Sequence, residues 1–230
     1  MELFNKIKDA KHHDRGLQPR EICWTCRQPK ASCYCSRIRR LDSGIDFVIL
    51  IHPIESRRRI ATGRMAHLIL QDSWLIEGED FSKCEKVRRL TADPARRCMI
   101  LYPGRTAMDL DEPETTKALQ NVVASHDKRL TIFVIDGTWA TARKMMRLSE
   151  NLRDLPMVKF QPTQESRFQV RKQPEKHCLS TIEAIHAVLD RLTPQAGNDQ
   201  GSSAKHDHLL ELFLEMVERQ KKFVPRFQTV

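Results

Sequence analysis

Three apolar segments, each ended abruptly by polar or turn-forming residues, constrain the fold of this chain most. They are "IDFVILIHP" (45–53), "RCMILYPG" (97–104) and "RLTIFVIDG" (129–137). Apolar runs of this length that do not alternate with polar residues predict strands buried on both faces. Helical patterns separate them, and this alternation is typical of an α/β fold with a mostly parallel sheet flanked by helices.

The segments between and after these strands show helical periodicity. The expected helices cover residues 55–72, 112–127, 140–152, 179–192 and 206–223, and residues 155–160 are expected to form a short fourth strand. On the first helix, Arg57 and Arg64 are expected two turns apart on one side. The composition of residues 193–205 indicates a loop.

The ends of the three strands carry unusual chemistry. The strands finish in "HPIE", "LYPG" and "DGTW". A parallel sheet binds ligands outside the carboxyl ends of its strands. Three such ends indicate loops gathered around one pocket, although the strand order does not follow from the sequence.

Four cysteines lie within thirteen residues, in "CWTCRQPKASCYC". They are Cys23, Cys26, Cys33 and Cys35. Four thiolates around one tetrahedral ion are the common structural zinc arrangement, and an iron–sulfur cluster is the alternative. A closed four-thiolate site has no open coordination position, so we expect no catalytic role for this metal.

The charge balance indicates an acidic partner. Lys and Arg total 39 against 30 Asp and Glu, a net charge of +9. Nucleic acid fits this balance because neutralised phosphates release counterions. Trp24 and Tyr34 interleave with the cysteines among several arginines, a mixture that suits RNA contact. A basic but inert, solvated surface is the alternative.

The length of 230 residues suits one substantial domain with a small addition. We expect an N-terminal segment with the zinc-binding module at 1–42 and the main domain at 43–230. No apolar run approaches the roughly 20 residues that span a bilayer, and the N-terminus lacks the apolar core of a secretion signal. A cytoplasmic protein without a membrane partner is therefore expected, with no disulfide framework among its seven cysteines.

Five motifs in order resemble one known family. The four-cysteine module, "HPIESRRRIATGRMA", "LYPG", "DGTW" and "RKQPEKHCLSTIEA" are similar to the DTW-domain proteins, the tRNA-uridine aminocarboxypropyltransferases. The resemblance covers roughly residues 21–192 and includes the signature in its Asp-x-Thr-Trp form, from Asp136 to Trp139. Ala61 departs from the pattern, in which asparagine is expected before the threonine.

The resemblance implies a fold and a reaction. The fold is that of the SPOUT class, whose sheet carries a trefoil-knotted site for S-adenosylmethionine. The reaction transfers the 3-amino-3-carboxypropyl group of this co-substrate to N3 of a tRNA uridine and releases methylthioadenosine. The short chain resembles the relatives that act on the variable loop.

With this resemblance, the candidate catalytic residues are Asp136, Thr138 and Trp139. Uridine N3 carries a proton, so its attack calls for a general base, and Asp136 at a strand end is the candidate. Gly137 allows a ligand to approach closely. The alternatives are that Asp136 or Thr138 caps the next helix, and that Trp139 belongs to a core stripe.

The resemblance also implies residues that bind the co-substrate and the tRNA. The co-substrate candidates are Leu101, Tyr102, Pro103, Gly104, Asp136, Gly137, Leu179, Ser180, Thr181 and Glu183. Ser180 and Glu183 also form a capping box by their spacing. The tRNA candidates are His52, Glu55, Arg57, Arg64, Arg143, Lys144, Arg147, Arg167, Arg171 and Lys172. For the cations, contact with solvent alone is the alternative, and for His52 a structural hydrogen bond.

Two other functions are compatible with the sequence. One is an S-adenosylmethionine-dependent RNA methyltransferase, which would release adenosylhomocysteine. The other is a zinc-containing RNA-binding protein without catalysis. Many knotted proteins pair, but the zinc module and the long C-terminal helix favour a monomer.

Overall fold

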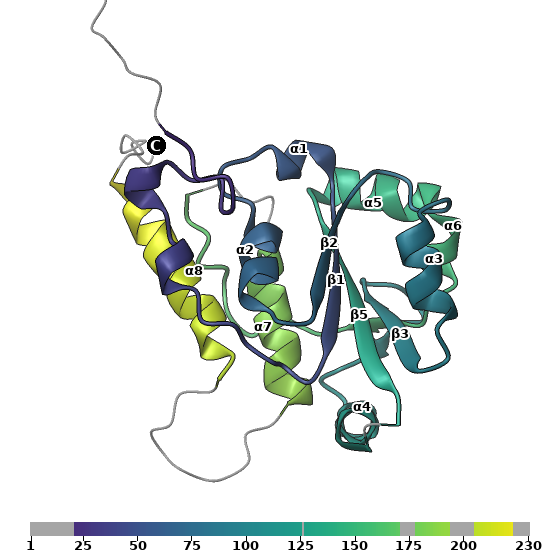
Figure 1. The fold of residues 1–230 in the computed structure, drawn as a ribbon. Helices are drawn as coiled ribbons and strands as arrows, with labels where there is room; N and C mark the ends of the chain where they lie inside the picture. The colour runs from purple at the N-terminus through teal and green to yellow at the C-terminus, as the bar shows by residue number, and fades with distance from the viewer. Residues whose placement is uncertain (1–20, 126, 171–177, 194–204, 223–230) are drawn as a thin grey trace, which may run out of the picture.

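The computed structural model describes residues 21–125, 127–170, 178–193 and 205–222. These residues form three layers, with helices on both faces of one sheet (Figure 1). None of the helices within these ranges combines the length and the apolar character that a bilayer span requires. The expected α/β class is confirmed.

The sheet has six strands in the order β2-β1-β5-β3-β6-β4, and every pairing between neighbours is parallel. The strands are β1 (Asp46–Ile51), β2 (Ser73–Glu77), β3 (Arg96–Leu101), β4 (Met108–Asp109), β5 (Arg129–Asp136) and β6 (Met157–Lys159). The predicted strands are present, and β5 lies between β1 and β3. Because both strands flanking β5 are parallel to it, the carboxyl ends of all three meet at one edge.

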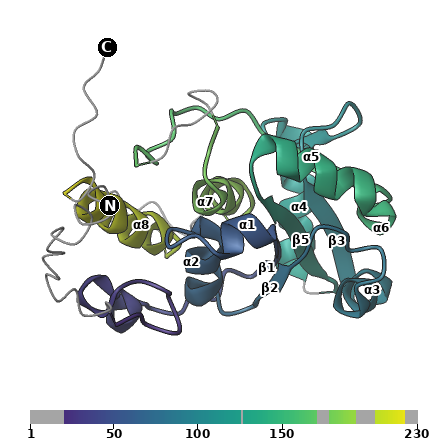
Figure 2. The same ribbon diagram turned by 90° about the horizontal axis from the view of Figure 1, so that it is seen from above.

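The helices cover both faces of the sheet. They are α1 (Pro53–Ser56), α2 (Thr62–Ile69), α3 (Glu85–Ala92), α4 (Pro113–Ser125), α5 (Trp139–Leu148), α6 (Glu150–Arg153), α7 (Thr181–Leu192) and α8 (Asp207–Lys221), with 3-10 turns at Lys30–Ser32 and Cys35–Arg37. Helices α2, α4 and α7 cover one face, with α8 packed outside α2 and α7. Helices α3, α5 and α6 cover the other face (Figure 2).

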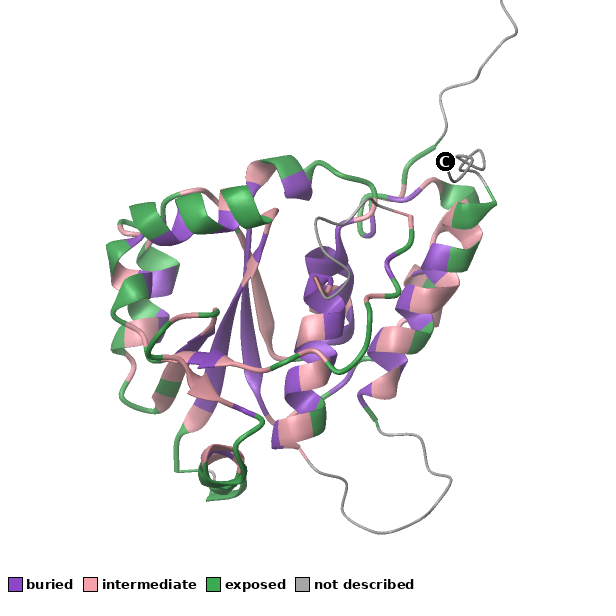
Figure 3. Ribbon diagram, turned by 180° about the vertical axis from the view of Figure 1, so that it is seen from behind, coloured by how far each residue is buried: buried purple, intermediate pink, exposed green. Residues whose placement is uncertain are grey.

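Alternating residues of β5 divide between the two cores. Ile132 and Val134 pack in the cluster with α2 and α7, whereas Phe133 packs in the cluster with α3 and α5. Burial on both faces explains the continuous apolar run, and Figure 3 shows the central strands buried over most of their length. The same alternation places Asp136 on the α2 and α7 side.

Two expected helices are each divided in the structure. The single helix over 55–72 is wrong, because α1 and α2 are separated by residues 57–61. The buried side chain of Arg64 donates to the carbonyls of Ser56 and Arg58, and these hydrogen bonds stabilise the non-helical segment between α1 and α2. Arg57 and Arg64 therefore do not share one helix face. The helix over 140–152 divides at Ser149, whose hydroxyl accepts from the N–H of Phe81 at 2.9 Å.

The four-cysteine segment packs against the rest of the protein. Buried Cys26 and Tyr34 belong to the same apolar cluster as α2, α7 and α8. Arg39 pairs with Glu211 of α8 at 3.0 Å, and Arg37 pairs with Glu215. Figure 2 shows this segment beside α8 and α2. The module is therefore held in a defined position, and the expected domain boundary after residue 42 stays a prediction.

Candidate active site

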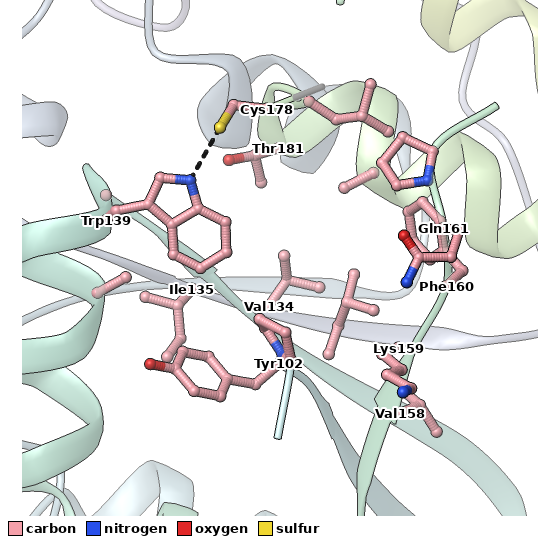
Figure 4. A pocket seen from close by; sticks show the side chains of 17 residues that line it. Tyr102, Val134, Ile135, Trp139, Val158, Lys159, Phe160, Gln161, Cys178 and Thr181 are labelled. Carbon is pink, nitrogen blue, oxygen red and sulfur yellow. Dashed lines mark hydrogen bonds between the residues drawn. The ribbon is translucent and has the colours of Figure 1, made fainter. Parts of the chain in front are cut away.

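A cavity of about 350 Å³ lies at the carboxyl ends of β3, β5 and β6, closed by the starts of α5 and α7 (Figure 4). This volume is typical of small-molecule sites. The lining residues are Leu101, Tyr102, Pro103, Val134, Ile135, Gly137, Trp139, Ala142, Val158, Lys159, Phe160, Gln161, Pro162, Cys178, Leu179, Thr181 and Ala184. The lining is mostly apolar with a few polar groups, as a pocket for an organic ligand requires.

The turn after β5 positions one wall of the cavity. Gly137 lies close to α5, because a Cβ atom there would come within 2.6 Å of the Thr141 hydroxyl. Thr138 then caps α5 by accepting from the N–H of Thr141 at 3.2 Å. The capping interpretation of Thr138 is therefore confirmed, and the cap sets the position of Trp139.

Trp139 lies at the rim of the cavity and is 40% exposed. Its indole Nε1–H donates to Sγ of Cys178 at 3.0 Å, a bond that joins the start of α5 to the segment before α7 (Figure 4). Trp139 is therefore not a core residue, and it offers an aromatic face to a ligand.

Asp136 is only 7% exposed and joins three elements. Its Oδ1 accepts from the hydroxyl of Thr181 at 2.7 Å, and its Oδ2 accepts from the N–H of Gly63 at 3.2 Å. Its backbone carbonyl accepts from the N–H of His52 at 2.9 Å. Asp136 does not line the cavity, but Gly137 and Thr181 do. The carboxylate of Asp136 thus lies behind the residues that line the cavity, and its role as a base stays a prediction.

Asp136 also performs the capping that Ala61 cannot. Helix α2 starts after Ala61, whose side chain has no acceptor. The first amides of a helix need acceptors, and a negative charge there is favourable. The carboxylate of Asp136 supplies both to Gly63, near the start of α2. The start of α2 thus has an acceptor from β5, although Ala61 supplies none.

The candidate co-substrate residues divide into two groups. Leu101, Tyr102, Pro103, Gly137, Leu179 and Thr181 line the cavity, whereas Gly104, Asp136, Ser180 and Glu183 do not. Ser180 and Glu183 form the expected capping box, with the N–H of Ser180 donating to Glu183 at 2.8 Å. Glu183 also accepts from the Ser166 hydroxyl and the Arg167 N–H, both at 2.7 Å. It therefore fastens the segment after β6 to α7.

Sequence reasoning missed the contribution of β6. Residues 158–162 at the end of this strand line the cavity, as do Cys178 and Ala184 around the start of α7. The strand itself was expected, and Pro162 just beyond it is a strand-ending signal like Pro103 after β3. That signal would have added a fourth strand end to the other three.

Most of the candidate tRNA-binding cations lie on the surface. Arg57, Arg143, Arg147 and Arg167 are exposed. Lys144 is paired with Glu79, and this hydrogen bond holds the pKa of Glu79 below its usual range. Arg171 and Lys172 lie outside the described residues.

Three other tRNA candidates are buried: His52, Glu55 and Arg64. His52 Nδ1 accepts from the N–H of Ile54 at 3.2 Å, as the structural interpretation of this residue expected. Glu55 contacts Arg58 at 3.3 Å. Burial lowers the pKa of Arg64, with a smaller contribution from nearby Arg27. The structure thus places these three side chains in the interior, where they hold α1 and the following loop.

The four cysteines converge on one point. The Sγ atoms of Cys23 and Cys35 are 3.7 Å apart, those of Cys26 and Cys33 are 3.6 Å apart, and all four lie within 4.8 Å of one another. A tetrahedral ion with bonds of about 2.3 Å places thiolates about 3.8 Å apart. Arg27 adopts a positive φ of 58° in the turn that brings Cys23 and Cys26 together. The geometry therefore fits a structural zinc ion.

A parallel α/β sheet with a cavity at its carboxyl edge, joined to a module of four converging cysteines, defines a class of α/β proteins with a four-cysteine module. Residues 20–221 match the DTW domain, so the chain belongs to the DTW domain family. The resemblance inferred from the five motifs is confirmed.

Named relatives agree with this family. A "tRNA-uridine aminocarboxypropyltransferase 2" of Drosophila melanogaster is 28% identical over 177 residues, which cover 74% of this chain and 66% of the fly protein. The Mus musculus protein of the same name is 29% identical, covering 75% of this chain and 57% of the mouse protein. A "tRNA-uridine aminocarboxypropyltransferase A" of Arabidopsis thaliana is 25% identical, covering 94% and 85%. This chain thus spans less than two thirds of the length of the animal relatives, and no solved structure matches it significantly.

Proposed function

We propose that the protein is a tRNA-uridine aminocarboxypropyltransferase that uses S-adenosylmethionine as the donor. The observation that carries the proposal is the cavity walled by Gly137 and Trp139 of the family signature and backed by Asp136. Family membership and the names of the relatives support the same activity.

The cavity offers suitable surroundings for the donor. The aromatic rings of Tyr102 and Trp139 provide faces for adenine or for the sulfonium, which is attracted to a ring face as other cations are. In the reaction, uridine N3 forms a bond to the carbon beside the sulfonium, the bond from that carbon to sulfur breaks, and methylthioadenosine leaves. The N3 proton must pass to a base.

Thr181 connects the cavity to the proposed base. Its side chain lines the cavity, and its hydroxyl donates to Asp136 at 2.7 Å. A proton from N3 can therefore pass to the hydroxyl oxygen while the hydroxyl proton passes to the carboxylate. Asp136 would act as the base through Thr181, without moving from its cap on Gly63.

We also propose that the fold is a SPOUT-like knotted one. The supporting observation is that β6 lies between β3 and β4, two strands that precede it in the chain. The chain after α6 therefore returns to a place between two earlier strands, a strand order that a knotted sheet would also have.

The proposed tRNA surface combines exposed cations with an exposed indole. Residues 57–59, three consecutive arginines, are exposed after α1, and Trp24 of the module is 95% exposed. Arg27 donates to the Ser56 carbonyl at 3.0 Å, and Gln28 donates to the Arg59 carbonyl at 2.6 Å. These bonds hold the module beside the arginines, so one tRNA could contact both, with uridine of the variable loop as the proposed target.

The decisive experiment incubates purified protein with S-adenosylmethionine and unmodified tRNA, followed by nucleoside mass spectrometry. We expect a uridine heavier by one aminocarboxypropyl group, together with methylthioadenosine. Adenosylhomocysteine with a methylated nucleoside would indicate a methyltransferase instead, and no product would indicate a binding protein. The Asp136→Asn variant keeps an acceptor for Gly63 but loses the base, so it should fold and modify tRNA far more slowly. Native activity in this variant would overturn the assignment of Asp136.

A further inference from the structure

A second group of possible metal ligands, distinct from the four cysteines, lies between α7 and α8. Its members are His186 and Asp190 on α7, and His206 and Asp207 at the start of α8. The two α7 residues are one helical turn apart and so lie on the same face of the helix. One ligand atom from each of the four residues lies within 4.8 Å of the other three.

The individual distances are close to those of a metal site. His186 Nε2 lies 3.0 Å from Asp207 Oδ1, and His206 Nε2 lies 2.6 Å from Asp190 Oδ1. Tetrahedral nitrogen and oxygen ligands with bonds of about 2.0–2.1 Å are about 3.3 Å apart. Small side-chain rotations would therefore admit an ion. Both imidazoles are held in place, since His186 is 8% and His206 is 6% exposed and their rings are in edge contact.

Two surrounding features complete such a site. The second oxygen of Asp190 lies 3.3 Å from Nδ1 of His186, and this contact holds the imidazole in the orientation that presents Nε2 to Asp207. A neighbouring cavity of about 220 Å³ is lined by His186 and Asp190, so an ion can reach the two ligands on α7 through it. Ligand identity, spacing, outer contacts and access are the features by which a metal site is judged.

We propose that His186, Asp190, His206 and Asp207 bind a divalent transition-metal ion, with Zn²⁺ as the ion that suits two imidazoles and two carboxylates. The ion fastens the start of α8 to α7. Helix α8 in turn contacts the four-cysteine module through Glu211 and Glu215. The ion therefore acts on the position of the module, and its ligands line neither the active-site cavity nor the four-thiolate site.

A matched pair of variants tests the proposal by metal content. Protein loaded with Zn²⁺ and freed of excess by gel filtration should hold two ions per chain. Asp207→Asn, which removes one ligand charge with little change in size, should hold one, and so should Cys26→Ser, which damages the other site. One ion in the native protein and one in Asp207→Asn would overturn the proposal.

Zinc X-ray absorption of the native protein provides a second reading that no folding defect can affect. Two occupied sites would give sulfur and nitrogen or oxygen neighbours in similar numbers, whereas the four-thiolate site alone would give sulfur only and would overturn the proposal. Thermal melting adds a functional measure. Zn²⁺ should raise the melting temperature of Cys26→Ser, and this rise should vanish when Asp207→Asn is added.

Discussion

The hydroxyl of Thr181 at the start of α7 donates to Oδ1 of Asp136 at the end of β5, at 2.7 Å. The two residues lie 45 positions apart in the chain. Thr181 lines the cavity and Asp136 does not, so this bond connects the cavity to the buried carboxylate. The proposed reaction depends on it.

Replacing Thr181 by valine should remove this link while keeping the shape of the side chain. A hydrogen bond to a charged group contributes about 1.5–3 kcal/mol. If the bond is used in the transition state, kcat/KM for tRNA should fall about ten- to a hundredfold. Thr181→Ser keeps a hydroxyl and should retain most of the activity. Equal activity in the valine and serine variants would show that Thr181 carries no proton.

A second prediction concerns the close approach of α2 to Asp136. A Cβ atom at Gly63 would lie 2.4 Å from Asp136 Oδ2 and 2.9 Å from Ile49. Both neighbours are buried, so Gly63→Ala should lower the free energy of unfolding by about 1–3 kcal/mol. Urea denaturation measures this loss. Lys117→Ala, at an exposed position of α4, provides the control and should change stability by less than about 0.5 kcal/mol.

The sequence predicted the central strands well for a physical reason. Strands β1, β3 and β5 lie inside the sheet, and a strand between two helical layers shows an apolar residue at nearly every position. Strand β2 lies at the edge and is only partly buried, so "SWLIE" lacks that signal. The break between α1 and α2 was also missed, because it depends on the buried contacts of Arg64 and not on local propensity.

The sequence predicted only those parts of the site that a local sequence pattern marks. The motif around Asp136 and the residues of "LYPG" were located because each follows a recognisable strand. The wall from β6 was missed because the pairing of β6 with β3 is a matter of strand order, which no local pattern encodes. The burial of Glu55 and Arg64 was equally invisible, since charged side chains ordinarily indicate a surface.

A third prediction uses the bond between Trp139 and Cys178 at the rim. A donor in the cavity should shield Sγ of Cys178, so S-adenosylmethionine should slow its alkylation, as followed by peptide mass spectrometry. Trp139→Phe keeps a ring but loses the N–H that holds Cys178. The variant should therefore alkylate faster without ligand and bind the donor less than tenfold more weakly. Trp139→Ala should weaken donor binding by tenfold or more. Unchanged alkylation in the presence of saturating donor would place the donor elsewhere.

A fourth prediction concerns pH and His67. Burial lowers the pKa of His67, and the nearby charges of Arg40 and Lys86 lower it further. The unfolded chain then binds a proton more readily than the folded protein, so this histidine costs stability as the pH falls below its ordinary pKa of about 6.5. The cost is absent above that pH and complete below the folded pKa.

The His67→Gln variant isolates this effect. Its difference in unfolding free energy from the native protein should shift in favour of the variant between pH 7.5 and pH 5, because glutamine does not titrate. Paired urea denaturation curves at the two pH values measure the shift. A difference that stays constant with pH would mean that His67 is not the group responsible.

The last prediction separates the metal module from the cavity. Cys26 is fully buried and is one of the four converging thiols, so Cys26→Ser should prevent the four-thiolate site from holding an ion and should loosen the module. Loss of about 3 kcal/mol would lower the melting temperature by about 6–12 °C.

The residues that line the cavity lie on β3, β5, β6, α5 and the chain around the start of α7, so the Kd of the same variant for S-adenosylmethionine should stay within about twofold. The Kd for tRNA should rise tenfold or more, because the module carries the exposed Trp24 and the hydrogen bonds that hold it beside the arginines at 57–59. Cys84→Ser, at a partly buried cysteine outside the cluster, is the matched control and should leave both dissociation constants unchanged. Equal weakening of donor and tRNA binding would show that the module supports the whole domain and not the RNA surface in particular.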